Sequence, residues 1–582
     1  MKHMSQRAHL MHYIPIRIGL CIPSGCTEDD LQNILNFAVK KFDMDAQVSY
    51  CEIKEGKPIY WIQIFAIIII CCLIFLVIAG TWMEMRSDPG VVRSDKLGDR
   101  IILSFSVISN FKRLFSTKTS MESFSCIHGL RFLTITWVVY GHAYLFPGLF
   151  VSNYRSLFRI PETATDPIPQ MIVNGSEAVD TFLFIAGLLV SYMTIKKVKL
   201  EKKKFNYLTF ALHRLWRIAP VVYFILLCSF LIPLMGSGPV FQEIMQNSIY
   251  PCFQQWWRNI LFINNFFDSY KACWRMTWYV SCDIQLYLIS VIVVLPMIWF
   301  KKMGIMINTL IVAASIIYTG IVTYLFDISP TIVVTHMNPD DEYYFFVYSY
   351  ANTLCRAGPY FIGVFTGYIL ITKPGIKISK KFQIIGWCLA TLSSGMVIFA
   401  TSIWYRVHSP TPLEGILYSA TYKVAFTAGV AWMTFCCIAG YGGFINTFLS
   451  WNVWMPLGKL AFLTYLIQPV FQMIYMANFR TTQEFAHLHF AIQYFGFLCI
   501  SMLLAFVANL LVESPFLTLE KLLFESKPRR EEKPEMDGHE NVGFENGDIT
   551  IKVNGQVEML TCENGTTNME DCKNRLNEKS EL

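Results

Sequence analysis

The sequence predicts an all-α protein that crosses a membrane about eleven times as a bundle of transmembrane helices. Two observations predict this fold class. Hydrophobic residues make up 54% of the 582 residues and charged residues only 15%, against roughly 25% charged residues in an average soluble protein. Apolar stretches of about 20 residues, long enough to cross a hydrocarbon core, also recur along the chain. Because the basic residues fall in short runs between these stretches, we expect no nucleic-acid partner.

The apolar stretches set the order of the predicted elements. A short soluble segment covers residues 1–59, the first helix residues 60–82, and a basic loop residues 83–124. The other helices, about ten, form one transmembrane domain over residues 125–524, and a polar tail covers residues 525–582. The predicted spans begin near Trp61, Ile127, Ser176, Ala211, Trp278, Ile305, Ala357, Phe382, Tyr422, Pro456 and Phe490.

Lysine and arginine in the connecting loops predict the orientation, because cytosolic loops carry the excess of these residues. Every second loop is basic except residues 440–455, which carry no charge and are placed by parity alone, and intervening loops such as residues 161–168 and 329–344 are acidic or neutral. The basic loops are residues 86–118, 196–204, 301–302 and 373–381, and the tail begins with Lys521. We therefore expect a multi-pass protein of the plasma membrane or an endomembrane, with a luminal or extracellular N-terminus and a cytosolic C-terminus.

The two ends of the chain are predicted to lie outside the bundle. Residues 1–59 carry no signal peptide although this orientation requires export, so we interpret them as a truncated luminal segment. Residues 525–582 are polar and are expected to form a disordered cytosolic tail. Cys252 and Cys273 share one luminal loop and are the disulfide candidates there. A disulfide is also expected in the N-terminal segment, which holds Cys21, Cys26 and Cys51.

Two ionisable residues lie within the predicted second span, where such groups are costly and mark functional sites. Arg131 and His142 are eleven residues apart, so they return to within about 20° of one helix face and lie about 16 Å apart along it. The orientation puts Arg131 toward the cytosol and His142 toward the lumen. The alternatives are a snorkelling arginine and a histidine satisfied by a neighbouring carbonyl.

Carboxylates lie in the predicted luminal half of nearby spans. Glu177 and Asp180 share one face of the third span, at a depth similar to that of His142. A carboxylate there could orient the imidazole and stabilise its protonated form, whereas Glu177 could instead be a solvated residue at the start of the span. Asp283 and Gln285, early in the fifth span, add polar lining in the same half.

Two arginines lie at the predicted cytosolic end of the fourth span. Arg214 and Arg217 share a helix face, which suits a ligand that carries phosphate. The alternative is the ordinary excess of positive charge beside a span. Arg356, at the luminal mouth of the seventh span, is expected to be an interfacial anchor. The sequence thus predicts a bundle with a basic cytosolic mouth and with its histidine and carboxylates in the luminal half.

Several motifs resemble the integral-membrane acyltransferase 3 family. The family pattern has an arginine and a histidine separated by ten residues in an early span, here Arg131 and His142. The further matches are G-L-R-F at residues 129–132, V-D-T-F-L-F-I-A-G at 179–187, R-x-x-R-I-x-P at 214–220 and W-Y-V-S-x-D at 278–283. The resemblance extends over residues 125–524 and implies acyl transfer.

A narrower resemblance is to the animal nose-resistant-to-fluoxetine branch of that family. It is carried by residues 19–31, G-L-C-I-P-S-G-C-T-E-D-D-L, which look like the end of the branch's cysteine-rich luminal domain. It also rests on the paired Cys252 and Cys273 and on the stretches at residues 262–266, 356–360 and 513–516. The branch often carries a histidine late in the tenth span, where this chain has Gln468, which cannot act as a base.

The leading hypothesis is a membrane O-acyltransferase. In it Arg131, Arg214 and Arg217 hold the phosphates of an acyl-CoA co-substrate at the cytosolic mouth. His142 removes the proton of a hydroxyl-bearing or lipid acceptor, and Asp180 orients the imidazole. We expect no metal and no bound cofactor. The alternative hypothesis is a lipid or small-hydrophobe transporter that uses the same fold without acyl transfer.

Overall fold

The computed structural model describes most of the chain up to Phe524 and three strands beyond it. The described residues are 19–40 without 24, 46–48, 51–52, 57–87, 96–117, 124–150, 170–268 without 173, 271–330, 343–524 without 407, 409 and 485, 543–545, 548–553 and 556–560. The chain divides near Lys521 into two units, which are described separately.

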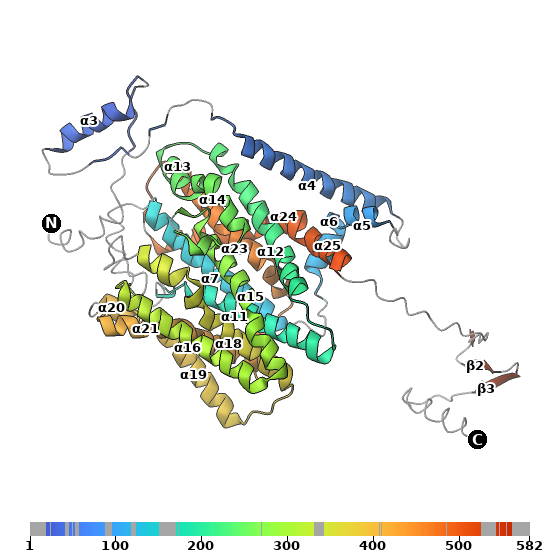
Figure 1. Ribbon diagram of the computed structural model, residues 1–582. Helices are drawn as coiled ribbons and strands as arrows, with labels where there is room; N and C mark the ends of the chain where they lie inside the picture. Colours follow the sequence, from blue (N-terminus) through green and yellow to red (C-terminus); the bar gives the residue numbers. More distant parts are fainter. Residues whose placement is uncertain are drawn as a thin grey trace. The chain divides into compact units, whose positions relative to one another are not determined.

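Long helices build the first unit (Figure 1). They are α4 (Trp61–Arg86), α7 (Ser125–Phe150), α11 (Glu177–Ile195), α12 (Tyr207–Ser229), α15 (Trp278–Trp299), α16 (Lys301–Leu325), α18 (Thr353–Thr372), α19 (Lys380–Phe399), α21 (Pro412–Ile438), α23 (Trp454–Ala477) and α24 (His487–Ala508). Ten helical segments of the described residues are long and apolar enough to cross a membrane, and α7 is a further helix of 26 residues. They coincide with the predicted spans, and the all-α polytopic fold class is confirmed. Lipid offers no partners to backbone N–H and C=O groups, so apolar segments that cross it must be helical.

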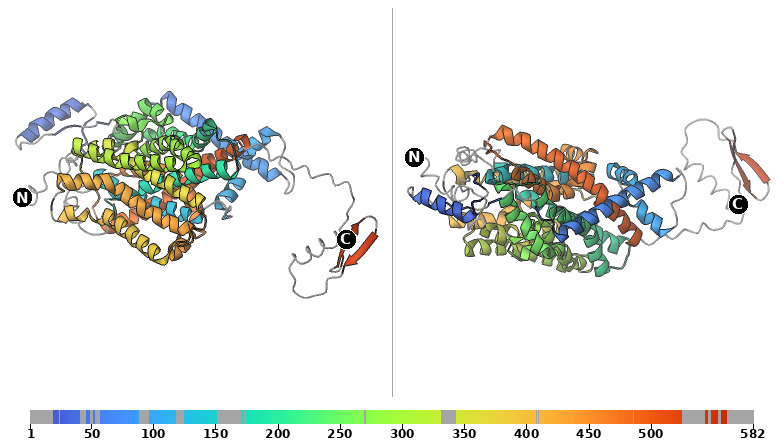
Figure 2. Two further views of the ribbon diagram at one scale, coloured as in Figure 1. Left: turned by 60° about the horizontal axis from the view of Figure 1, so that its bottom comes forward. Right: turned by 90° about the horizontal axis from the view of Figure 1, so that it is seen from above.

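Shorter elements connect the long helices, which run in roughly a common direction (Figure 2). Turns of π-helix extend three of them: η2 (Lys196–Leu200) follows α11, η8 (Phe345–Tyr350) precedes α18, and η9 (Asn509–Glu513) joins α24 to α25 (Ser514–Phe524). The remaining short helices are α3 (Glu28–Val39), α5 (Leu97–Leu103), α6 (Val107–Phe115), η3 (Ile232–Leu234), α13 (Pro239–Ile244), η4 (Met245–Ile249), α14 (Tyr250–Ile260), η5 (Asn264–Phe266), η7 (Arg275–Thr277), α20 (Ser402–Arg406) and α22 (Gly443–Leu449).

The bundle has two chemically different ends. The connections after α11, α15 and α18 carry the lysine-rich loops, and we call the end that holds them the basic end. The opposite end holds α13 and α14, and we call it the disulfide end, because Cys252 of α14 is bonded there to Cys273. This bond confirms the predicted pair. Cys21, Cys26 and Cys51 carry free thiols, so the disulfide expected in the N-terminal segment is not formed.

Glycines let two pairs of helices approach until their backbones touch. A Cβ atom at Gly187 of α11 would overlap the carbonyl oxygen of Tyr360, and one at Gly363 of α18 would overlap that of Phe184. On another pair, a Cβ at Gly458 of α23 would lie 2.5 Å from the carbonyl oxygen of His128 of α7. Small residues drive such close packing in membranes, where lipid removes the hydrophobic force between helices. These two contacts fix the neighbours of Asp180 and His142.

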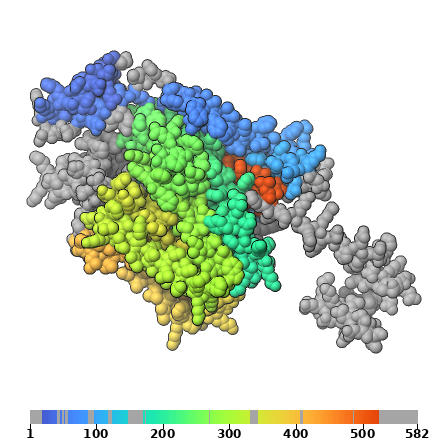
Figure 3. All heavy atoms as spheres, viewed as in Figure 1, coloured from blue at the N-terminus to red at the C-terminus, as the bar shows by residue number. Residues whose placement is uncertain are grey.

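Other helices present apolar surface to the surroundings. Helix α4 exposes large side chains along its length, and Figure 3 shows this part of the chain, in blue, along one edge of the visible face. The exposed residues of α4 include Ile64, Phe65, Phe75 and Ile78, and those of α19 include Ile384, Leu389 and Leu392. A helix with this composition is stable only beside lipid or another apolar partner. The exposed apolar faces therefore agree with a bundle that is surrounded by a bilayer.

The second unit contains a three-stranded antiparallel sheet in the order β1, β2, β3. Its strands are β1 (Gly543–Glu545), β2 (Asp548–Val553) and β3 (Gln556–Leu560). Phe544 pairs with Ile549 across the first ladder, and Ile551 pairs with Glu558 across the second. The sequence predicts disorder throughout residues 525–582, and these strands differ from that prediction. The rest of the segment lies outside the described residues.

Candidate functional site

His142 lies on α7 and faces α23, which the contact at Gly458 holds against α7. Its Nδ1 atom lies 2.5 Å from Nε2 of Gln468, and its ring stacks on Phe146 one turn further along, with 4.9 Å between centroids. Nε2 of Gln472 donates to Oε1 of Gln468 at 2.8 Å. Both glutamines are fully buried, whereas His142 is partly exposed. The partner of the histidine is therefore an amide.

Asp180 lies elsewhere in the contact network and does not orient His142. Both carboxylate oxygens accept from Nη1 of Arg356 at 2.7 Å, and both side chains are 0% exposed. Nε of Arg356 donates to the carbonyl oxygen of Tyr350 at 2.9 Å, and the guanidinium lies over the rings of Tyr350 and Trp278. The predicted pairing of Asp180 with His142 is wrong. The backbone contact between α11 and α18 places Arg356, and not His142, against the carboxylate.

Arg356 is not the interfacial anchor that its place in the sequence predicts. It stands in the first turn of α18, but η8 precedes that helix and adds another helical segment, so Arg356 lies inside the bundle. Its Nη2 atom is buried and has no hydrogen-bond partner among the described residues. The place of Arg356 near the start of an apolar stretch therefore predicted too shallow a position in the bundle.

A buried lysine joins the same region, and sequence reasoning missed it. Lys423 of α21 is 1% exposed, its Nζ atom lies 3.4 Å from Oγ of Ser349, and it stands over the ring of Tyr422. Glu177 is also buried and accepts from Oγ of Ser176 at 2.7 Å, so it is not a solvated residue. Lys423 could have been identified from the sequence, because it is a lone charged residue within the predicted ninth span.

Asp283 pairs with Arg214, although the sequence predicts the arginine at the cytosolic mouth and the carboxylate in the luminal half. Nη2 of Arg214 donates to Oδ2 of Asp283, and the two side chains are 22% and 4% exposed. The guanidinium also lies 5.1 Å from the ring centroid of Tyr287. The predicted separation into a basic mouth and an acidic half is therefore wrong for this carboxylate, because α12 and α15 overlap in depth enough for the long arginine side chain to reach it.

Gln285 belongs to a polar network that holds the chain before α15. Its Nε2 donates to the carbonyl oxygen of Phe262 at 2.9 Å and to Asn265 at 2.8 Å, and its Oε1 accepts from Thr353 at 2.6 Å. Asn259 continues the network with bonds to the carbonyl oxygen of Cys273 and to Thr277. Since the amide of Gln285 is satisfied by these partners, its role is structural.

Arg131 and Arg217 form a pair of like charges near the basic end. Arg131 lies within electrostatic range of Arg217, Arg214 and Glu513, and its strongest interaction with a charged side chain is with Arg217. Neither Arg131 nor Arg217 forms a side-chain hydrogen bond or an ion pair with the described residues. Glu513 is bonded to Asn509 at 2.6 Å. The structure thus brings the three predicted arginines together and leaves two of them without a bonded counter-ion.

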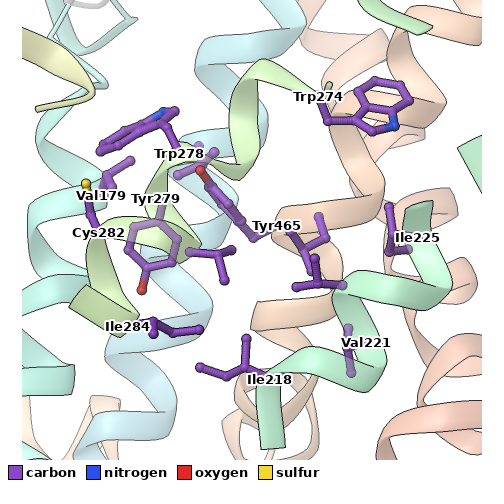
Figure 4. Packing of buried hydrophobic residues seen from close by; sticks show 14 of the residues in the cluster. Val179, Ile218, Val221, Ile225, Trp274, Trp278, Tyr279, Cys282, Ile284 and Tyr465 are labelled. Carbon is purple, nitrogen blue, oxygen red and sulfur yellow. The ribbon is translucent and has the colours of Figure 1, made fainter. Parts of the chain in front are cut away.

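Aromatic and aliphatic side chains fill the space between these polar groups. Figure 4 shows Val179, Ile218, Trp278, Tyr279 and Tyr465 in one cluster of buried residues from α11, α12, α15 and α23. The rings of Tyr279 and Tyr465 lie 5.1 Å apart, and the hydroxyl of Tyr465 donates to the carbonyl oxygen of Met276 at 2.9 Å. An apolar core therefore occupies the space between α11, α12, α15 and α23.

Comparisons with known proteins bear on this arrangement. A family model described as an acyltransferase domain, of the acyltransferase 3 type, matches residues 124–510. The chain is 25% identical to nose resistant to fluoxetine protein 6 of Caenorhabditis elegans over 558 residues, which covers 88% of this chain and 67% of that protein. It is 24% identical to regulator of hypoxia-inducible factor 1 of the same organism over 249 residues, which covers 40% of this chain and 46% of the relative. No solved structure matches the chain.

Proposed function

Because this chain belongs to the acyltransferase 3 family, whose domain covers residues 124–510, we propose that it is a membrane O-acyltransferase. It takes an acyl group from acyl-CoA at the basic end, which we assign to the cytosol, and passes it to a hydroxyl acceptor within or across the membrane. The observation that carries this proposal is that Arg131 and Arg217 repel each other inside the bundle, while neither forms a hydrogen bond or an ion pair with the described residues.

Two guanidinium groups repel each other by a few kcal/mol at the effective dielectric constant of a protein interior. Glu513 interacts with both arginines and offsets part of this repulsion, and a bound anion would offset the rest. Phosphate oxygens suit this site best, because the guanidinium fork bonds two oxygens of one phosphate at once. Arg214 is held beside the site by its ion pair with Asp283, which offsets its charge.

The distance between the arginines and the histidine supports acyl-CoA as the anion. Arg131 and His142 share a face of α7 and are about 16 Å apart along its axis. The pantetheine arm that separates the pyrophosphate of coenzyme A from its sulfur spans roughly 14 Å when extended, since it has the bond count of about four extended amino-acid residues. A donor whose phosphates bind at Arg131 therefore places its thioester near His142.

His142 is the proposed general base. The imidazole takes the proton of the acceptor hydroxyl while the hydroxyl oxygen attacks the thioester carbonyl. The tetrahedral intermediate then collapses, the carbon–sulfur bond breaks, and the proton passes from the imidazole to the departing thiolate. The products are an ester and coenzyme A, and the histidine returns to its neutral form.

The proposal is tested with purified protein in lipid nanodiscs supplied with radiolabelled acyl-CoA and extracted membrane lipids or luminal contents. We expect a labelled ester, loss of its formation in His142→Ala, and at least tenfold weaker binding of acyl-CoA in Arg217→Gln and Arg131→Gln. Arg480→Gln is the matched control, because Arg480 is an exposed arginine that follows α23 and bonds Ser237, away from the three arginines. Equal binding in all four proteins, full activity in His142→Ala, or lipid uptake without any ester would overturn the proposal.

A further inference from the structure

The strongest unexplained contact in the molecule is the amide chain behind His142. Gln468 and Gln472, which we call the glutamine pair, are four residues apart on one face of α23. Gln468 lies against Nδ1 of the histidine, and Gln472 lies against Gln468. Both amides are 0% exposed, and Oε1 of Gln472 has no hydrogen-bond partner among the described residues. A buried amide oxygen without a hydrogen-bond partner destabilises the fold, so this arrangement calls for an explanation.

We propose that Gln468, backed by Gln472, is the positioning residue of His142 and selects which ring nitrogen carries the proton. The inference rests on the proposed acyl transfer, in which His142 is the base. Because Gln468 occupies Nδ1, the nitrogen that faces the reactants is Nε2, for which no hydrogen bond to the described residues is found. The glutamine takes the place that a carboxylate occupies behind a histidine in many hydrolases, without adding a charge.

The glutamine pair has two arrangements that keep both of its hydrogen bonds. In one, Nε2 of Gln468 donates to Nδ1, so the ring proton is on Nε2 and the ring can donate there. In the other, both amides are turned, Oε1 of Gln468 accepts from Nδ1–H, and Nε2 of the ring is free to take a proton. Turning an amide by 180° exchanges its oxygen and nitrogen but leaves the positions of the heavy atoms unchanged. The same coordinates therefore fit both arrangements. The two amides must turn together, because two N–H groups cannot face each other.

Acyl transfer uses the turned arrangement, in which Nε2 of the ring first accepts a proton and then gives it up. The turned arrangement serves when the ring accepts the hydroxyl proton, and the bond from Nδ1–H to Gln468 then holds the imidazolium. The proton leaves through Nε2 to the sulfur of coenzyme A, and Nδ1–H stays bonded throughout. Gln468 is the side chain that forms a hydrogen bond with the ring among the described residues, so the amide is the group that sets its tautomer.

The test compares three variants in nanodiscs. Gln468→Met keeps the shape but has neither donor nor acceptor, and we expect kcat to fall about 100-fold with KM for acyl-CoA unchanged. Gln472→Met removes the backing of Gln468, and we expect a fall of about tenfold. Gln468→Glu keeps the acceptor and adds a charge, so it should retain more activity than Gln468→Met and should shift the pH–rate profile upward by about one to three units.

A second readout works without acyl transfer. Diethyl pyrocarbonate acylates unprotonated imidazole nitrogen, so its rate of reaction with His142, measured by mass spectrometry across pH, reports protonation of the ring. In Gln468→Glu we expect the midpoint of this curve to rise by about one to three pH units relative to wild type. An unshifted midpoint overturns the positioning role, and so does a Gln468→Met protein that folds, binds acyl-CoA and keeps wild-type kcat. A wild type that makes no ester defeats the proposed function alone, because the labelling curve still decides the role of Gln468.

Discussion

The ion pair between Asp180 and Arg356 makes the sharpest prediction about stability. Arg356→Met removes both 2.7 Å bonds to a carboxylate that is 0% exposed, and so leaves a buried charge without its partner. Loss of one member of such a pair costs about 3 to 5 kcal/mol, which is roughly a 150- to 5,000-fold change in the unfolding equilibrium. Asp180→Asn leaves Arg356 and the nearby Lys423 facing each other without that carboxylate, so its cost should be at least as large. The double variant Asp180→Asn/Arg356→Gln removes both charges of the ion pair and should recover most of the loss.

The measurement is unfolding of the purified protein in mixed micelles with increasing sodium dodecyl sulfate, followed by tryptophan fluorescence. Lys302→Met, at an exposed lysine of α16, is the control for loss of a positive charge and should change the unfolding free energy by less than about 0.5 kcal/mol. A double variant as unstable as the worse single variant would refute the reasoning, because the cost would then come from lost packing. The pyrocarbonate labelling curve of His142 should be the same in Asp180→Asn as in wild type, and a downward shift would restore Asp180 as its partner.

Three further predictions concern packing, the disulfide and the anion site. Gly363→Ala should destabilise the protein by about 1 to 3 kcal/mol, because the new Cβ overlaps a carbonyl oxygen of α11; Gly395→Ala on α19 meets nothing within 4 Å and should be neutral or slightly stabilising in the same unfolding assay. Replacing Cys252 and Cys273 by serine should cost about 3 kcal/mol for a sequence separation of 21 residues, and reductant should then destabilise wild type but not the variant. Binding of acyl-CoA, measured by isothermal titration, should weaken as NaCl rises from 0.05 to 0.5 M, and the same salt dependence in Arg217→Gln and wild type would contradict the anion site.

Much of the fold could be predicted because its signals are local. Each span is an uninterrupted apolar stretch whose length matches a bilayer, so the eleven long helices were visible without knowledge of their neighbours. The pairing of Cys252 with Cys273 could also be predicted, since both lie in the one connection between α12 and α15. The turn η8 could not be predicted, because the aromatic stretch at residues 345–350 looks like a loop that approaches an interface. That turn buries Arg356, and the error about its depth follows from it.

The partners within the site depended on packing between segments far apart in the sequence. Asp180 and Arg356 meet because Gly187 and Gly363 remove the side chains between two helices, and nothing near Asp180 in the sequence indicates this contact. Spacing correctly placed Arg131 and His142 on one face of a helix, which is a local property. It could not show that Gln468, singled out as a departure from the family pattern, would be the residue that touches His142.

The backbone contact between α11 and α18 has a mechanical consequence. Where main chains touch, no layer of side chains can slide or repack, so the two helices behave as one rigid block that carries Asp180 and Arg356 together. The contact of α7 with α23 makes a second block, which carries His142 and Gln468. A widening of the bundle between the two blocks would move the histidine away from the buried charges while leaving each pair of partners intact.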